Sequence, residues 1–247
     1  MERKMLLTLS YDGSDFAGWQ VQKHERTVQG ELERALEVMH RRPVRATAAG
    51  RTDSGVHARR QKAHFTTDLD SVSPEKFVPA LNGLLPRDVR IIASREVPGT
   101  FHARYDAVSR EYRYIVTWNR LLRSDTSTRA WFMDRCPSVS LLNSYAREII
   151  GTRDFTACCA AGDSSETRLR RIEAAIWYPM GTHLVFMIRG NAFLWKMVRS
   201  LVGTMIELEA SGAPGSAMAD ILASKDRCRA GITAPAHGLY LWEVSYG

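Results

Sequence analysis

The order in which strands and helices are expected along the chain most constrains its fold, because the same order occurs twice. In the first half, β-rich apolar runs alternate with segments that are apolar on one helical face. The resulting order, β-α-β-β-α-β, is that of a ferredoxin-like unit. The predicted strands cover residues 5–11, 44–49, 62–67 and 89–97, and the predicted helices run over 28–39, with Thr27 as N-cap, and over 73–84, opened by Ser73-Pro74.

The second half repeats this order. Its predicted strands are 110–118, 172–178, 183–189 and 239–246, and its predicted helices are 141–150 and a long one from Phe193 through Met205. Residues 211–234, rich in Gly, Ala and Ser, are extra to the pattern and include a possible short helix at 217–222. We therefore predict an α+β protein with two ferredoxin-like (βαββαβ) halves, residues 1–105 and 106–247.

The charge balance favours a polyanionic partner. The chain has 34 Lys and Arg against 27 Asp and Glu, which gives a formal net charge of +7. No apolar run reaches the roughly 20 residues that span a bilayer, so we expect no membrane association. The cysteines form neither a disulfide framework nor a C-x-x-C motif, which favours a reducing compartment and predicts a cytoplasmic protein. These cysteines are Cys136, Cys158, Cys159 and Cys228.

The motifs of common cofactor sites are absent from the sequence. No G-x-G-x-x-G follows a predicted strand, and no G-x-x-x-x-G-K-[ST] occurs, so we expect no nucleotide cofactor. The histidines lack the spacing of a zinc site, so we expect no metal either. Ser73 matches the S-x-x-K pattern of serine acyl-enzymes, but no K-T-G accompanies it and helix capping explains the segment.

The segment most suited to chemistry is the polar loop between the second and third predicted strands, residues 50–58. Two glycines let its backbone turn tightly and approach a ligand. Asp53 lies at its centre, and Arg51 is close enough in sequence to keep the carboxylate ionised and oriented. An ionised aspartate can serve as nucleophile, general base or metal ligand. A β-turn whose aspartate caps backbone N–H groups explains the same residues.

Further motifs accompany this loop along nearly the whole chain. They are Tyr11–Gln20, Phe101–Arg104, Arg110–Tyr114, Gly151–Phe155, Phe193-Leu194 with Met197–Arg199, and Thr233–Ala236 with Gly238-Leu239. Together and in this order they resemble the motifs of the TruA family of tRNA pseudouridine synthases. The resemblance implies that the two halves form the pseudouridine synthase-type mixed, mainly antiparallel sheet with a central cleft.

The resemblance also implies roles for five residues. Asp53 would be the nucleophile that breaks the glycosidic bond of uridine, Tyr112 would stack on the target uracil, and Arg199 would pair with Asp53. Arg51 would displace and replace the flipped nucleotide, and Leu239 would line the uracil pocket. Taken by their patterns alone, Tyr112 is also explained as a core aromatic on an alternating strand, and Arg199 as a snorkelling side chain on an apolar helix.

The implied function is isomerisation of uridines 38, 39 and 40 in the anticodon stem-loop of tRNA, without cofactor, by a homodimer in which one tRNA contacts both subunits. An alternative is a non-catalytic tRNA-binding module of the same fold. Another is the same chemistry on a different RNA. The three principal residues, Asp53, Tyr112 and Arg199, favour the enzyme.

The sequence departs from the family pattern in two places. Arg153 stands where the family usually has histidine, and the residues at 156–159 that follow are atypical. Trp195-Lys196 occupies a position where a histidine is common. We expect RNA contacts or local packing to differ at these two places, with the reaction unchanged.

Overall fold

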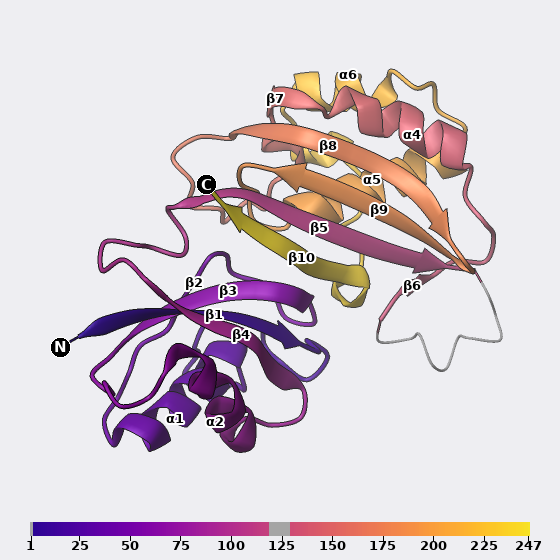
Figure 1. Ribbon diagram of the computed structural model, residues 1–247. Helices are drawn as coiled ribbons and strands as arrows, with labels where there is room; N and C mark the ends of the chain where they lie inside the picture. Colours follow the sequence, from indigo (N-terminus) through magenta and orange to yellow (C-terminus); the bar gives the residue numbers. More distant parts are fainter. Residues whose placement is uncertain (1, 119–128) are drawn as a thin grey trace. The chain divides into compact units, whose positions relative to one another are not determined.

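The computed structural model describes residues 2–118 and 129–247, which form two compact units (Figure 1). One unit contains the chain up to Val108 together with Tyr240–Gly247, and the other is Ser109–Leu239. The first boundary lies three residues from the one expected at 105/106. The last strand groups with the first unit because Tyr240 and Leu241 pair in parallel with His57 and Ala58. Hydrophobic periodicity identifies that strand but does not encode its partner. The assignment of 1–105 and 106–247 as repeated halves stays a prediction.

The first unit has the strand order of a ferredoxin-like fold. Its sheet runs β4-β1-β3, with β2 and β10 also paired to β3. Strands β1, β3 and β4 are mutually antiparallel where they pair. The elements are β1 (Arg3–Tyr11), α1 (Val28–His40), β2 (Thr47–Ala48), β3 (His57–Thr67), the 3-10 turn η1 (Pro74–Lys76), α2 (Phe77–Leu84), β4 (Val89–Val97) and β10 (Leu239–Tyr246).

The core of this unit lies between the sheet and its two helices, which Figure 1 shows on the same side of the sheet. β1 is central, and five consecutive residues from Met5 to Leu9 are buried, as a strand covered on both faces requires. α1 begins where the sequence predicts, because the Thr27 side chain accepts a hydrogen bond from the N–H of Gly30 at 3.2 Å. Phe65 of β3 meets Phe77 of α2 edge-on, with ring centroids 5.5 Å apart.

The second unit contains an antiparallel sheet in the order β5-β9-β8-β7, with β6 beside β5. Trp177 of β8 joins this sheet to the helices, since its backbone exchanges two hydrogen bonds with Asn143 and its ring lies against Met205. The elements are β5 (Ala107–Thr117), β6 (Trp131–Phe132), α4 (Val139–Glu148), β7 (Gly151–Asp154), the 3-10 turn η3 (Thr156–Cys158), β8 (Leu169–Met180), β9 (His183–Gly190), α5 (Met197–Ala210), α6 (Ala217–Ser224), and the 3-10 turns η4 (Arg227–Arg229) and η5 (Ala236–Gly238).

The α+β class and the mainly antiparallel pairing are confirmed, and most predicted elements are present. The differences are local. The strand expected over 44–49 is reduced to β2, and β7 was not expected. α5 begins at Met197 instead of Phe193, because Lys196 has a left-handed φ of 60° that breaks the helix. Ser73 makes no side-chain cap, and a 3-10 turn precedes α2.

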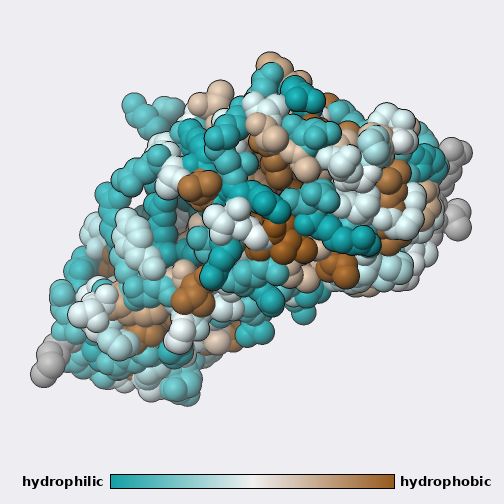
Figure 2. Space-filling model, turned by 90° about the horizontal axis from the view of Figure 1, so that it is seen from above, coloured by the Kyte–Doolittle hydropathy of each residue, from teal (hydrophilic) through white to brown (hydrophobic). Residues whose placement is uncertain are grey.

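The surface is largely polar on the face that Figure 2 shows, where brown hydrophobic residues are interspersed with teal and white ones. Across residues 2–118 and 129–247, no helix is both long enough and apolar enough to cross a membrane.

Candidate functional site

The Asp53 loop is held by the segment that carries the Tyr11–Gln20 motif. The N–H of Trp19 donates to the carbonyl of Thr52 at 3.0 Å, and the N–H of Gly55 donates to the carbonyl of Phe16 at 3.2 Å. The Tyr11 hydroxyl is hydrogen-bonded to Thr52 Oγ1 at 2.8 Å inside the core. The two motifs, more than 30 positions apart in the sequence, therefore build one local structure with Asp53 at its centre.

Two glycines let these segments approach so closely. A Cβ at Gly13 would lie 2.1 Å from the carbonyl oxygen of Val56, and one at Gly18 would lie 2.6 Å from that of Thr52. Gly18 also has a φ of +101°, which side chains rarely adopt. A side chain at either position would push the loop away from its support.

His57, near the end of the 50–58 segment, is the first residue of β3 and fastens the far end of the turn around Asp53. Its Nδ1 accepts a hydrogen bond from the N–H of Gly13 at 3.0 Å and lies 3.2 Å from a carboxylate oxygen of Asp12. The ring is buried and stacks on Tyr240, with centroids 4.6 Å apart. Both ends of the loop are thus anchored within the first unit.

Asp53 itself is half-buried. Its backbone carbonyl accepts from the N–H of Val56 at 3.1 Å, which closes a tight turn. Both Arg51 and Ser54 are exposed. The loop therefore combines a fixed backbone with a half-buried aspartate and an exposed cationic residue two positions before it, an arrangement suited to a charged or polar ligand.

In the second unit, Tyr112 and Tyr114 lie on the same side of β5 but in different surroundings. Tyr114 is fully buried, and its hydroxyl donates to the carbonyl of Pro235 at 2.8 Å. Burial raises the pKa of the Tyr114 hydroxyl well above its usual value. Tyr112 is only half-buried and meets Phe193 edge-on, with centroids 5.1 Å apart. The core-aromatic interpretation therefore fits Tyr114 better than Tyr112.

Arg199 lies in the first turn of α5, and the segment that carries the 233–236 motif holds it. Its Nε donates to the carbonyl of Ala234 at 2.8 Å, and the N–H of Ala234 donates back to the carbonyl of Arg199 at 3.1 Å. A Cβ at Gly203, one turn later, would lie 1.9 Å from the carbonyl of Ile232. The guanidinium group is therefore fixed in direction, which a snorkelling side chain would not be.

The five predicted site residues divide between the two units. Asp53 and Arg51 share one loop of the first, whereas Tyr112, Arg199 and Leu239 belong to the second. Leu239 is buried at the end of the second unit. Their assembly into a single site stays a prediction.

Sequence reasoning did not identify the supporting residues of either part. In the first unit these are Tyr11, Gly13 and His57, and in the second Tyr114 and Ala234. The available signal was the joint presence of the motifs, since all five residues lie inside motif segments, His57 within 50–58.

The unusual Trp195-Lys196 pair stands where backbone hydrogen bonds tie the start of α5 to a distant loop. The N–H of Trp195 donates to a carboxylate oxygen of Asp163 at 2.5 Å, and its carbonyl accepts from the N–H of Ala160 at 3.0 Å. Burial alone would raise the pKa of Asp163, but hydrogen bonds from Trp195, Ser165 and the Arg168 guanidinium outweigh burial and lower that pKa to about 2. This ionised aspartate ties the start of α5 to the loop after η3.

No group of three or more His, Cys, Asp or Glu side chains is arranged to hold a metal ion within the two described stretches, 2–118 and 129–247.

Comparison with known proteins gives the class to which this fold and loop belong. A family model described as tRNA pseudouridine synthase matches residues 8–106 and 145–247, which include the Asp53 loop and Arg199. The chain belongs to the tRNA pseudouridine synthase family, whose members are isomerases.

Curated relatives narrow the subgroup. The chain is 45% identical to tRNA pseudouridine synthase A of Treponema denticola over 99% of its own length and 93% of that protein. It is 44% identical to the enzyme of the same name from Anoxybacillus flavithermus, with 99% of both chains covered. A third, from Halalkalibacterium halodurans, is also 44% identical, over 96% of this chain and 90% of that protein.

Proposed function

We propose that this protein isomerises uridine to pseudouridine in the anticodon stem-loop of tRNA, at positions 38, 39 and 40, with Asp53 as the nucleophile. The observation that carries the proposal is the Asp53 loop, which the segment Tyr11–Gln20 holds at the Thr52 carbonyl, the Gly55 N–H and the His57 ring. Such anchoring suits a group that must meet a reacting atom in one position.

The reaction needs no group from outside the substrate. The bond from C1′ of the ribose to N1 of the uracil breaks and a bond from C1′ to C5 forms. The proton on C5 leaves to water and N1 takes up a proton from water, so the atoms of substrate and product balance. Asp53 would assist cleavage of the first bond as nucleophile and depart when the second forms. Because no atom is gained and no redox change occurs, no cofactor is required.

The flipped uridine would be bound and positioned by four residues, which are Tyr112, Arg51, Arg199 and Leu239. Extrusion of a stacked base costs about a few kcal/mol, and an aromatic ring against the base recovers part of this. The half-buried ring of Tyr112 is suited to stack on the uracil, and the exposed Arg51 to enter the space that the nucleotide leaves. Arg199 would pair with Asp53, and Leu239 would line the uracil pocket.

The decisive experiment is tritium release from tRNA that carries tritium at C5 of uridine. The wild-type protein should release it, and Asp53→Asn should release none above background. Asp15→Asn is the matched control, since Asp15 is an exposed aspartate in the neighbouring segment. Absence of release from the wild type would refute the enzyme and favour the non-catalytic binding module, and equal release from Asp53→Asn would refute the nucleophile.

We further propose that the protein is a cytoplasmic homodimer that binds one tRNA across both subunits. Sedimentation equilibrium checks the subunit number, and a monomeric mass at micromolar concentration would contradict it. Mapping of the modified positions in tRNA and in a second structured RNA distinguishes the anticodon stem-loop from another RNA as substrate.

A further inference from the structure

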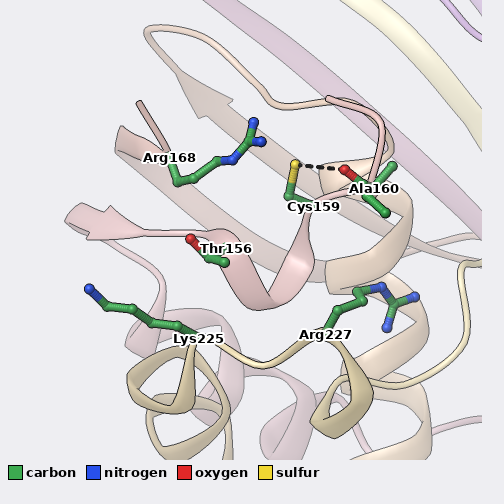
Figure 3. Close-up of a pocket in the computed structure, with 7 residues that line it drawn as sticks. Thr156, Cys159, Ala160, Arg168, Lys225 and Arg227 are labelled. Carbon is green, nitrogen blue, oxygen red and sulfur yellow. Dashed lines mark hydrogen bonds between the residues drawn. The ribbon is translucent and has the colours of Figure 1, made fainter. Parts of the chain in front are cut away.

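A basic pocket in the second unit has no part in the site described above. It has a volume of about 240 Å³ and lies between η3, the start of β8 and the turn after α6. Among the described residues that line it, three have cationic side chains and none has a carboxylate (Figure 3). The lining residues are Thr156, Cys159, Ala160, Ala161, Arg168, Lys225 and Arg227. It therefore combines the atypical residues at 156–159 with the extra segment 211–234.

The three cations keep hydrogen-bonding capacity for a ligand. Arg168 is held by Asp163, and Arg227 donates to the carbonyls of Ala230 and Gly231 and to the Thr233 side chain. These bonds use only part of the five N–H groups of each guanidinium. They fix both guanidinium groups in place, so a ligand would meet positioned donors.

Lys225 is held less firmly than the arginines. It forms an ion pair with Asp154 at 2.9 Å, and its side chain is 62% exposed. An exposed pair of this kind contributes little and is screened by salt. A stronger anion can therefore take the ammonium group from Asp154 without disturbing the fold.

The directions of these side chains favour an extended anion. In Figure 3, Arg168, Lys225 and Arg227 point in different directions, and their charged ends lie apart from one another. A single small phosphate is best held by donors that converge on one point, whereas the repeating charges of a nucleic-acid backbone suit donors that are spread out. We propose that this pocket binds the phosphodiester backbone of the substrate RNA, with Lys225 as a phosphate-contacting residue. The inference rests on the proposed function for its choice of RNA.

The backbone at Lys225 supplies a test that separates charge from folding. Lys225 ends α6 with a left-handed φ of 53°, where glycine is the default residue. Lys225→Gly therefore removes the charge and relieves the backbone at once, so it should not lower the melting temperature. Arg41 offers a matched control, because it is an exposed basic residue that ends α1 with a φ of 57° in the first unit.

The experiment measures the binding of an unmodified tRNA transcript by fluorescence anisotropy at 0.1 M KCl. Each phosphate contact contributes about 0.7–0.9 to the slope of log K against log salt, so loss of one lowers affinity roughly five- to eightfold at that salt. We expect this loss, and the smaller slope, for Lys225→Gly and no comparable loss for Arg41→Gly. Lys225→Arg should restore binding, and Lys225→Asn, which also tolerates this φ, should repeat the loss.

Three outcomes would overturn the proposal. One is an equal effect of Lys225→Gly and Arg41→Gly, which would reflect net charge alone. Another is an unchanged affinity in Lys225→Gly. The third is that inorganic phosphate raises the melting temperature of the wild type but not of Lys225→Gly, while both proteins bind tRNA equally. That result would assign the pocket to a small phosphate. Tritium release by the wild type is measured separately, so failure of the pocket and failure of the proposed activity are distinct results.

Discussion

Substitution of Gly13 by alanine tests whether the two motif segments really fix Asp53. The added Cβ would lie 2.1 Å from the carbonyl oxygen of Val56, whereas such contacts are essentially never shorter than 3.0 Å. One of the two backbones must therefore move by about 0.9 Å. The N–H of Val56 is bonded to the carbonyl of Asp53, so this displacement reaches the proposed nucleophile directly.

The structure sets the scale of both consequences. Overpacking of this kind costs about 1–3 kcal/mol, which lowers the melting temperature by roughly 2–12 °C for a chain of this size. A misplacement near 1 Å of a catalytic group costs on the order of 100-fold in rate. We expect Gly13→Ala to lose about 100-fold in kcat for tritium release, measured below its melting temperature and at saturating tRNA.

Gly99→Ala is the control, since a Cβ at that exposed position meets nothing within 4 Å. It should keep both kcat and melting temperature within error. A Gly13→Ala protein with wild-type kcat and stability would refute the view that close backbone contact positions Asp53. A protein with reduced stability but unchanged kcat would show that the contact supports only the fold.

Three further predictions concern buried groups. Burial, with the nearby charges of His102 and Lys4, lowers the pKa of His64 from 6.5 to about 4, so the neutral ring stabilises the folded state above pH 6.5. Thermal melts should show that this contribution to stability is lost as the pH falls from 6.5 towards 4. The substitution His64→Gln should remove this pH dependence. Tyr114→Phe should lower the urea midpoint by an amount equivalent to about 1 kcal/mol, because the half-buried Pro235 carbonyl loses its hydrogen-bond donor. In alkylation by iodoacetamide at pH 8, the two exposed cysteines should react and the two buried ones should not. The reason is that burial raises the pKa of both buried thiols, one of them to about 12. Rapid modification of four thiols in the folded protein would contradict this prediction. The exposed cysteines are Cys136 and Cys228, and the buried ones are Cys158 and Cys159.

The elements that the sequence predicted well are those whose signal is local. The start of α1 at Val28 depends on its neighbour Thr27, and the strand 89–97 depends on its own apolar residues, so both agree with the structure. The start of α5 was wrong because Phe193 continues the apolar spacing of the helix. The helix cannot extend back to Phe193 because the N–H of Trp195 is hydrogen-bonded to Asp163, in a loop about 30 residues earlier. Hydrophobic periodicity holds no information on this bond.

The chemistry of the candidate site could be predicted from the sequence, but the contacts that hold its residues in place could not. Asp53 stands out by residue type among glycines and small polar residues. The attachment of its neighbour Thr52 to Tyr11 and Trp19 depends on contacts between distant segments, which no local pattern encodes. Alternation placed Tyr112 and Tyr114 on one face of the same strand, but only packing decides which of the two is buried.

The kind of contact that holds the Asp53 loop explains why few residues in the sequence reveal it. The Asp53 loop is held chiefly through backbone groups, with the N–H groups of Gly13, Trp19 and Gly55 as donors. Backbone hydrogen bonds do not require particular side chains, but they require that the two segments come within contact distance. The sequence therefore has to specify the absence of a side chain at Gly13 and Gly18 more strictly than the presence of one elsewhere in the segment. Asp15 is exposed and takes part in none of these three bonds, which is why it serves as the control for Asp53.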